Sequence, residues 1–121
     1  MTAKECIMGR RSIRQFTNQA IGHDLLSEIV ETASYSPSWK HTQIVRYIAI
    51  EGEVKERIAN ECTDMWPNNG KIMNSAPVVM AITVIKNRCG YERDGSFTTP
   101  RKDTWQMYDA GIASQTLCLA A

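Results

Sequence analysis

The stretch DLLSEIVETASYSPSWKHTQIVRYIAIE, residues 24–51, contains the clearest local signs of secondary structure in the chain. Its first half predicts an α-helix, because apolar residues recur at the spacing of one helix face: Leu25, Leu26, Ile29, Val30 and Ala33. Pro37 ends this predicted helix, since the residue before a proline is pushed out of the α region. A polar loop follows, and residues 45–51 favour a β-strand.

The segments around this stretch continue the mixture of helices and strands. Residues 3–9 predict a short helix, and residues 52–66 predict an amphipathic helix with one apolar face: Val54, Ile58, Ala59 and Cys62. The sequence PNNG at residues 67–70 is typical of a break between elements. Residues 76–85, APVVMAITVI, predict a strand that is covered on both faces. After a polar loop at residues 86–103, the pattern becomes helical up to Ala121.

This last predicted helix has no charged residue after Asp109 and no cap at its end. A helix with so little polar surface is expected to be buried or to face a partner, and small residues would allow close approach: Ala110, Gly111, Ala113 and Ser114. A plain core helix is the alternative. Two strands are few for a stable sheet. We therefore expect a single domain over residues 1–121 that is truncated at its C-terminal end.

Composition excludes several classes of protein. The chain has 121 residues, of which 43% are hydrophobic and 22% charged, with a formal net charge of +1, so any anion site must be local. No segment resembles a signal peptide or a membrane span. The four cysteines form no CxxC pair and are far apart, which argues against a zinc site and a disulfide framework. We expect a reduced, cytoplasmic protein.

A local anion site is predicted near the start, in MGRRSIRQF at residues 8–16. Forked guanidinium donors and one hydroxyl fall within five positions: Arg10, Arg11, Ser12 and Arg14. Such a set can surround the oxygens of a phosphate. The alternative is a solvated basic turn, which this pattern alone favours.

Two other polar segments are candidate ligand sites. In PSWKHTQ, residues 37–43, Trp39 could stack on a planar ligand and His41 could be considered as a general base, although no carboxylate lies at an informative spacing. In NNGKIMN, residues 68–74, amides and Lys71 could bind the carbonyls of a heterocycle. Taken singly, an ordinary polar loop and a turn with a surface lysine are the simpler interpretations.

Together and in this order, these segments resemble the nitroreductase family of FMN-dependent oxidoreductases. RRSIRQF is similar to the family's Arg-x-Ser-x-Arg motif, and SPSWKHTQ to its Pro-Ser-x-x-Asn-x-Gln turn between helix and strand. KIMNSAPVVMAITV resembles its Lys-bearing approach to a central strand, and YDAGIASQTLCLAA its Asp-x-Gly-x-Ala-x-Gln helix. His41 stands where the family usually has Asn, and Ile44 where Pro is common.

The resemblance implies an α+β, three-layer fold with a central, mostly antiparallel sheet flanked by helices, incomplete in this chain. It also implies a homodimer with FMN at its interface. Arg10, Arg11, Ser12 and Arg14 would hold the phosphate and ribityl chain. The flavin would be lined from the opposite subunit by Pro37, Ser38 and Trp39, with His41 and Gln43 nearby, while Asn68 and Lys71 would reach the polar edge of the ring. No catalytic side chain and no metal are expected, because the flavin carries the chemistry.

The expected function is transfer of hydride from NAD(P)H through FMN to a nitroaromatic, quinone or similar flat, conjugated acceptor. A flavin-binding protein that stores or senses FMN without turnover is the alternative, because the same residues would serve it. A small module that binds nucleic acid through these arginines is disfavoured by the net charge of +1 and the single short basic patch. No membrane partner is expected.

Overall fold

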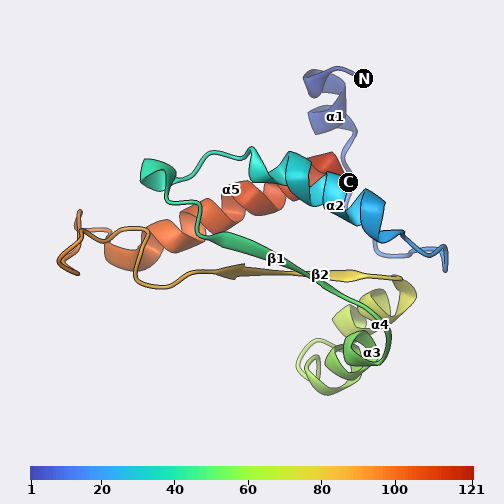
Figure 1. The fold of residues 1–121 in the computed structure, drawn as a ribbon. Helices are drawn as coiled ribbons and strands as arrows, with labels where there is room; N and C mark the ends of the chain where they lie inside the picture. The colour runs from blue at the N-terminus through green and yellow to red at the C-terminus, as the bar shows by residue number, and fades with distance from the viewer. The chain divides into compact units, whose positions relative to one another are not determined.

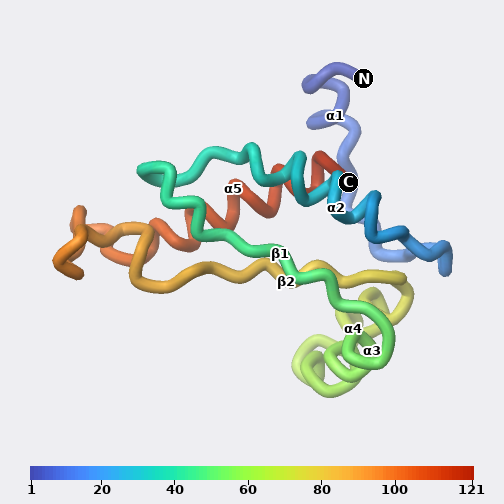
Figure 2. Tube along the Cα trace, viewed as in Figure 1, coloured from blue at the N-terminus to red at the C-terminus, as the bar shows by residue number.

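The computed structural model describes residues 1–121 as an α+β fold with two paired strands (Figures 1 and 2). In chain order the elements are α1 (Ala3–Gly9), α2 (His23–Ser34), the 3-10 turn η1 (Trp39–His41), β1 (Val45–Ile50), α3 (Gly52–Glu61), α4 (Pro67–Ser75), β2 (Val79–Val84), the 3-10 turn η2 (Lys102–Thr104) and α5 (Trp105–Ala120). The strands are antiparallel, and just beyond them the Ile85 N–H donates to the Ile44 carbonyl at 2.9 Å. The predictions for the first two helices, both strands and the last helix are confirmed.

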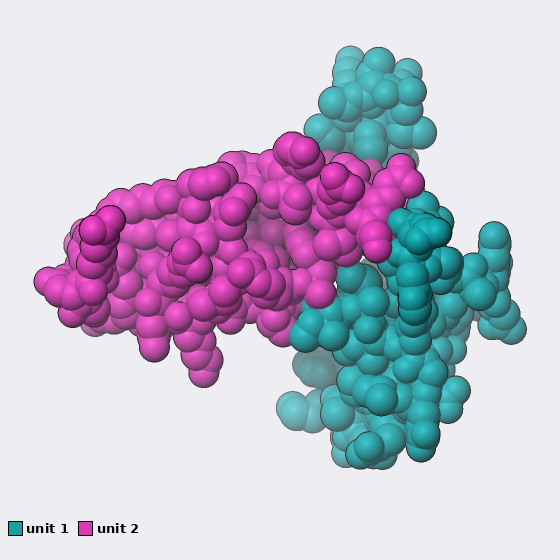
Figure 3. Space-filling view, viewed as in Figure 1, with its two compact units in different colours: residues 1–26, 48–81 teal, residues 27–47, 82–121 magenta.

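The chain folds as two compact units (Figure 3), and the residue ranges place the boundary between them within both strands. Unit 1 contains residues 1–26 and 48–81, and unit 2 contains residues 27–47 and 82–121. Unit 1 thus holds α1, α3 and α4, whereas unit 2 holds η1, η2, α5 and most of α2.

Helices α3 and α4 pack against each other in unit 1, and here one expectation was wrong. The sequence PNNG does not separate two elements: it forms the first turn of α4, where Pro67 is tolerated because the first helical N–H groups have no intrahelical partner. Gly70 is buried against α3, where a Cβ would come within 2.5 Å of the Ala59 carbonyl oxygen. The buried Lys55 side chain donates to the Ala76 carbonyl at 2.6 Å. This bond provides a donor for a backbone carbonyl at the C-terminal end of α4.

Two predicted apolar faces are less covered than expected. Val54 and Cys62 are exposed, and α3 ends at Glu61 instead of continuing to residue 66. β2 was expected to be covered on both faces, but its residues are half-buried apart from the exposed Thr83. The faces of a strand are covered by elements packed above and below the sheet, because a paired strand covers only its edge.

The core of unit 2 is a stripe along α5. Asp109, Ala113 and Leu117 are buried at successive four-residue steps, which places them on one face of the helix. Other fully buried residues of this unit are Ala33, Ile44 and Cys89. The rest of α5 includes exposed apolar side chains, among them Met107 and Tyr108. The only charged residue of this helix therefore lies on its buried face.

Candidate functional site: an exposed arginine segment and a strained turn

The arginine segment, which contains Arg10, Arg11, Ser12 and Arg14, directly follows α1. Thr2 begins this helix with a capping box in which its hydroxyl accepts from the Glu5 N–H and the Glu5 carboxylate accepts from the Thr2 N–H. Arg10 ends the helix, and residues 10–22 have no regular secondary structure. The short helix is therefore followed by an irregular, exposed segment that contains the predicted phosphate-binding residues Arg10, Arg11, Ser12 and Arg14.

Part of the donor capacity of this segment is used locally. One Arg11 nitrogen donates to the Met8 carbonyl at 2.8 Å and to the Arg10 carbonyl at 2.9 Å, and one Arg14 nitrogen donates to the Ser12 carbonyl at 3.2 Å. No carboxylate forms an ion pair with these arginines. Because a guanidinium has five N–H donors, the segment retains most of its capacity for an external anion.

Asn68 and Lys71 lie on α4, three residues apart and therefore on neighbouring positions of one face. Both side chains are exposed. The sequence placed Lys71 shortly before a strand, and in the structure it lies in α4, the helix that precedes β2. Unit 1 thus contains the arginine segment and this amide and lysine pair.

Unit 2 contains the other predicted site residues, which form one strained turn. We call residues 37–43 the Trp39 turn. Within it, Lys40, His41 and Gln43 have φ angles of 45°, 55° and 48°, in the left-handed region that residues other than glycine rarely adopt. Each such residue costs about 1–3 kcal/mol and persists only where surrounding contacts impose it.

Hydrogen bonds inside the Trp39 turn support this conformation. The Ser38 carbonyl accepts from the His41 N–H at 3.0 Å, and the Ser38 hydroxyl accepts from the Gln43 N–H at 3.0 Å. The Trp39 carbonyl accepts from both the N–H and the hydroxyl of Thr42, at 3.0 and 2.9 Å. The turn therefore leaves the side chains of His41 and Gln43 exposed while its backbone is bonded internally.

A buried carboxylate fixes the turn from outside, and sequence reasoning missed it. Both oxygens of Asp109 accept from the Trp39 N–H, at 3.0 and 3.1 Å, and the Cys89 thiol donates to Oδ2 at 3.2 Å. Asp109 is 1% exposed and Cys89 is fully buried. The available signal was a single acidic residue in an otherwise uncharged helix, but nothing local indicated its partners.

The Cys89 thiol is held in its protonated form. Burial, followed by the hydrogen bond and the negative charge of Asp109, raises the pKa of this thiol to about 11, while a hydrogen bond from Thr42 acts in the opposite direction. At neutral pH the thiol is therefore a donor to the carboxylate and a poor nucleophile.

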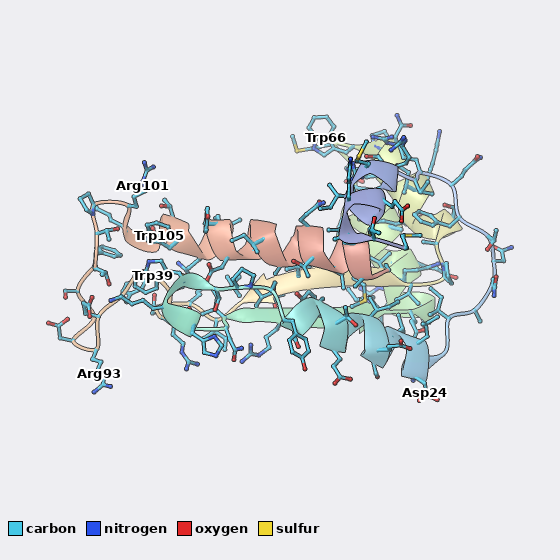
Figure 4. All side chains as sticks on the ribbon, turned by 90° about the horizontal axis from the view of Figure 1, so that it is seen from above. Asp24, Trp39, Trp66, Arg93, Arg101 and Trp105 are labelled. Carbon is cyan, nitrogen blue, oxygen red and sulfur yellow. The ribbon has the colours of Figure 1, made fainter.

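Aromatic side chains cover one side of the turn. The rings of Trp39 and Trp105 stack with centroids 6.2 Å apart, and Figure 4 shows the two residues close together. Tyr108 meets Trp105 edge to face at 5.6 Å. Lys40 lies 4.8 Å from the Trp39 ring centre and forms an ion pair with Glu92 at 3.1 Å. These contacts join η1 to the start of α5 and the loop before it.

An open groove of about 250 Å³ lies beside the turn in unit 2. Its lining combines polar and apolar side chains, and the polar ones include Ser36, Ser38, Gln43, Arg46, Tyr47 and Asp109. Burial raises the pKa of the Tyr47 hydroxyl, so this group is a neutral donor at physiological pH.

The structure gives two further findings about the chain. No group of three or more His, Cys, Asp or Glu side chains is arranged to bind a metal ion. None of the helices combines the length and the apolar character needed to cross a bilayer.

Comparisons with known proteins were made for sequence and for fold. A model of the nitroreductase family matches residues 7–121. The chain is 32% identical to the nitrobenzene nitroreductase of Ectopseudomonas oleovorans over 62 residues, which cover 51% of this chain and 27% of that protein. It is 34% identical to the iodotyrosine deiodinase of Haliscomenobacter hydrossis over 68 residues, which cover 54% of this chain and 31% of that protein.

A similar solved structure comes from Desulfovibrio desulfuricans and contains FMN. It is 26% identical, with a TM-score of 0.71, over 98% of this chain and 60% of that chain. The present chain thus spans less than a third of the two curated relatives and about 60% of this solved structure. The α+β fold predicted from the sequence is confirmed. Because the family model covers nearly all of its residues, the chain belongs to the nitroreductase family.

Proposed function

We propose that this protein is an FMN-dependent oxidoreductase that uses NAD(P)H to reduce a nitroaromatic, a quinone or a similar conjugated acceptor. The observation that carries the proposal is the arginine segment, where three exposed guanidinium groups and one hydroxyl fall within five residues and no carboxylate neutralises them. This donor set fits a phosphate monoester such as that of FMN. Family membership and the FMN in the Desulfovibrio structure support the same cofactor.

The other site residues would bind and orient the flavin. The Trp39 turn would present Pro37, Ser38 and Trp39 from the second subunit of a homodimer, with His41 and Gln43 nearby. Asn68 and Lys71 on α4 would contact the polar edge of the ring, where the positive charge of Lys71 favours a reduced, anionic flavin. When bound, FMN would supply the redox chemistry by accepting hydride from NAD(P)H and passing electrons to the acceptor.

The phosphate site is tested by comparing FMN with riboflavin, which has the same ring but no phosphate. Charged hydrogen bonds contribute about 1.5–3 kcal/mol each, so Arg10→Ala and Arg14→Ala should each weaken FMN binding by about 10- to 100-fold and leave riboflavin binding unchanged. Arg57→Ala is the control, because Arg57 is exposed and paired with Glu61 on α3. Equal losses for both flavins, or no loss, would refute the phosphate assignment.

Turnover is tested separately by the rate of NAD(P)H oxidation with an added quinone. The proposed enzyme should exceed the rate of free FMN at the same concentration. A protein that binds FMN without exceeding that rate would instead store or sense the flavin. Two relatives are a nitrobenzene nitroreductase and an iodotyrosine deiodinase, and these names support an aromatic acceptor.

A further inference from the structure

Asp109 combines three features that packing alone does not require. It is the only charged residue of α5, its side chain is 1% exposed, and both of its oxygens accept hydrogen bonds. Removing a carboxylate from water is unfavourable unless hydrogen bonds replace the lost hydration. An apolar residue at this position would avoid that cost, so the charge must contribute something that an apolar side chain could not.

The contacts of Asp109 indicate what the charge contributes. Its two oxygens receive the Trp39 N–H, and its Oδ2 also receives the Cys89 thiol. Trp39 lies directly before Lys40 and His41, two of the left-handed residues of the Trp39 turn. Fixing one backbone N–H at this point restricts the dihedral angles that follow it. The hydrogen bond from the thiol, in turn, restrains Oδ2 of the carboxylate.

We propose that Asp109 is the positioning residue of the Trp39 turn, and that Cys89 orients its carboxylate. The charged acceptor selects the strained backbone that presents Ser38, Trp39, His41 and Gln43. This rests on the proposed function, because these are the residues expected to line the flavin. Asp109 acts on the ligand through the turn and need not touch it.

An amide of the same size replaces this carboxylate only in part. Both oxygens face the Trp39 N–H, at 3.0 and 3.1 Å. In Asp109→Asn, either orientation of the amide directs its NH₂ group toward a donor, because Asn has a single acceptor oxygen. Asp109→Asn keeps one oxygen that can accept from the Trp39 N–H, but it loses the negative charge and places an NH₂ group against the same N–H. It should therefore weaken the hydrogen bond to Trp39 while preserving the volume of the side chain.

The decisive experiment measures amide hydrogen exchange at Trp39 in the full chain by NMR, together with FMN affinity. Loss of a charge-assisted hydrogen bond should accelerate exchange at Trp39 by about 10- to 100-fold in Asp109→Asn, while the amides in the middle of α5 remain protected. FMN binding should weaken by a comparable factor. The control is Leu117→Ala, which removes a buried side chain from the same face of α5 without touching the turn. It should lower overall stability and leave the native chemical shift of the Trp39 amide unchanged.

Unchanged exchange at Trp39 in Asp109→Asn would overturn the proposal, as would a changed native chemical shift of the Trp39 amide in Leu117→Ala. If Asp109→Asn does not fold, amide exchange in the wild-type chain tests the proposal instead. Its Trp39 amide should exchange as slowly as amides of α5, and exchange at the rate of an unbonded loop amide would overturn the proposal. Absence of FMN binding to the wild-type chain would count against the proposed function, whereas the exchange comparison would still test the role of Asp109.

Discussion

Gly70 shows how a single missing side chain permits the packing of two helices. A Cβ at this position would lie 2.5 Å from the Ala59 carbonyl oxygen and 2.6 Å from the Thr63 hydroxyl oxygen. Gly70→Ala should therefore lower the free energy of unfolding by about 1–3 kcal/mol, because the backbone of α3 would have to move. Urea denaturation monitored by circular dichroism measures this change.

Gly9→Ala is the matched control for this prediction. Gly9 also lies in a helix, but a Cβ there would meet nothing within 4 Å. Alanine should then be neutral or stabilising by up to about 1 kcal/mol, because it loses less backbone entropy on folding. Equal effects at the two positions would contradict the close contact between α3 and α4.

The Cys89 thiol makes stability depend on pH in the alkaline range. Its pKa rises from 9.0 to about 11 on folding, mainly through burial. As the pH rises from 9 to 11, the unfolded chain releases this proton while the folded chain retains it, so rising pH favours unfolding. Wild type should lose about 2 kcal/mol more than Cys89→Ser over this interval, as measured by denaturant unfolding. Parallel pH profiles for the two proteins would show that Cys89 does not titrate as described.

Individual residues were predictable where neighbours in the sequence reveal their chemistry. The arginine segment is an example, because its donors fall within five positions and remain exposed in the structure. The hydrogen bond from the Trp39 N–H to the Asp109 carboxylate joins residues that are 70 positions apart. No local pattern could predict that partner, and the left-handed conformations at Lys40, His41 and Gln43 depend on such tertiary contacts.

At the scale of elements, the pair α3 and α4 depends on a buried lysine. The Lys55 ammonium donates to the Ala76 carbonyl at 2.6 Å and is 9% exposed as a residue. Lys55→Met should leave this carbonyl without its donor and lower the free energy of unfolding by about 1–3 kcal/mol. Thermal and urea unfolding provide the measurement. The exposed Lys71→Met on α4 should change stability by less than about 0.5 kcal/mol, and a similar loss for both variants would argue against the buried bond.

Elements with strong hydrophobic periodicity were predicted well, and those formed through packing were not. The helix around residues 24–36 and the strand after it follow directly from apolar spacing and the proline between them. The sequence PNNG instead contains residues that are common in turns, and it forms the start of α4 because its glycine fits against α3. Tertiary packing here outweighed local propensity.

At the scale of the whole molecule, the chain exposes apolar side chains that a second copy could cover. Met107 and Tyr108 on α5 are 71% and 61% exposed, and Ile7 and Met8 on α1 are 59% and 65% exposed. We expect a homodimer in solution, with a mass near twice 13.6 kDa by light scattering. Met107→Glu should shift this mass toward that of one chain, whereas the exposed Glu28→Gln on α2 should not. A wild-type mass of one chain would contradict the expected dimer.

We propose above all that the protein binds FMN, with the phosphate of FMN held by the arginine segment. The most direct test of this proposal is the visible absorption spectrum of the purified protein, before and after incubation with FMN, with any released cofactor identified by mass. The account predicts the absorption bands of a bound flavin and the mass of FMN. A protein that remains colourless after incubation with FMN and gel filtration would contradict it.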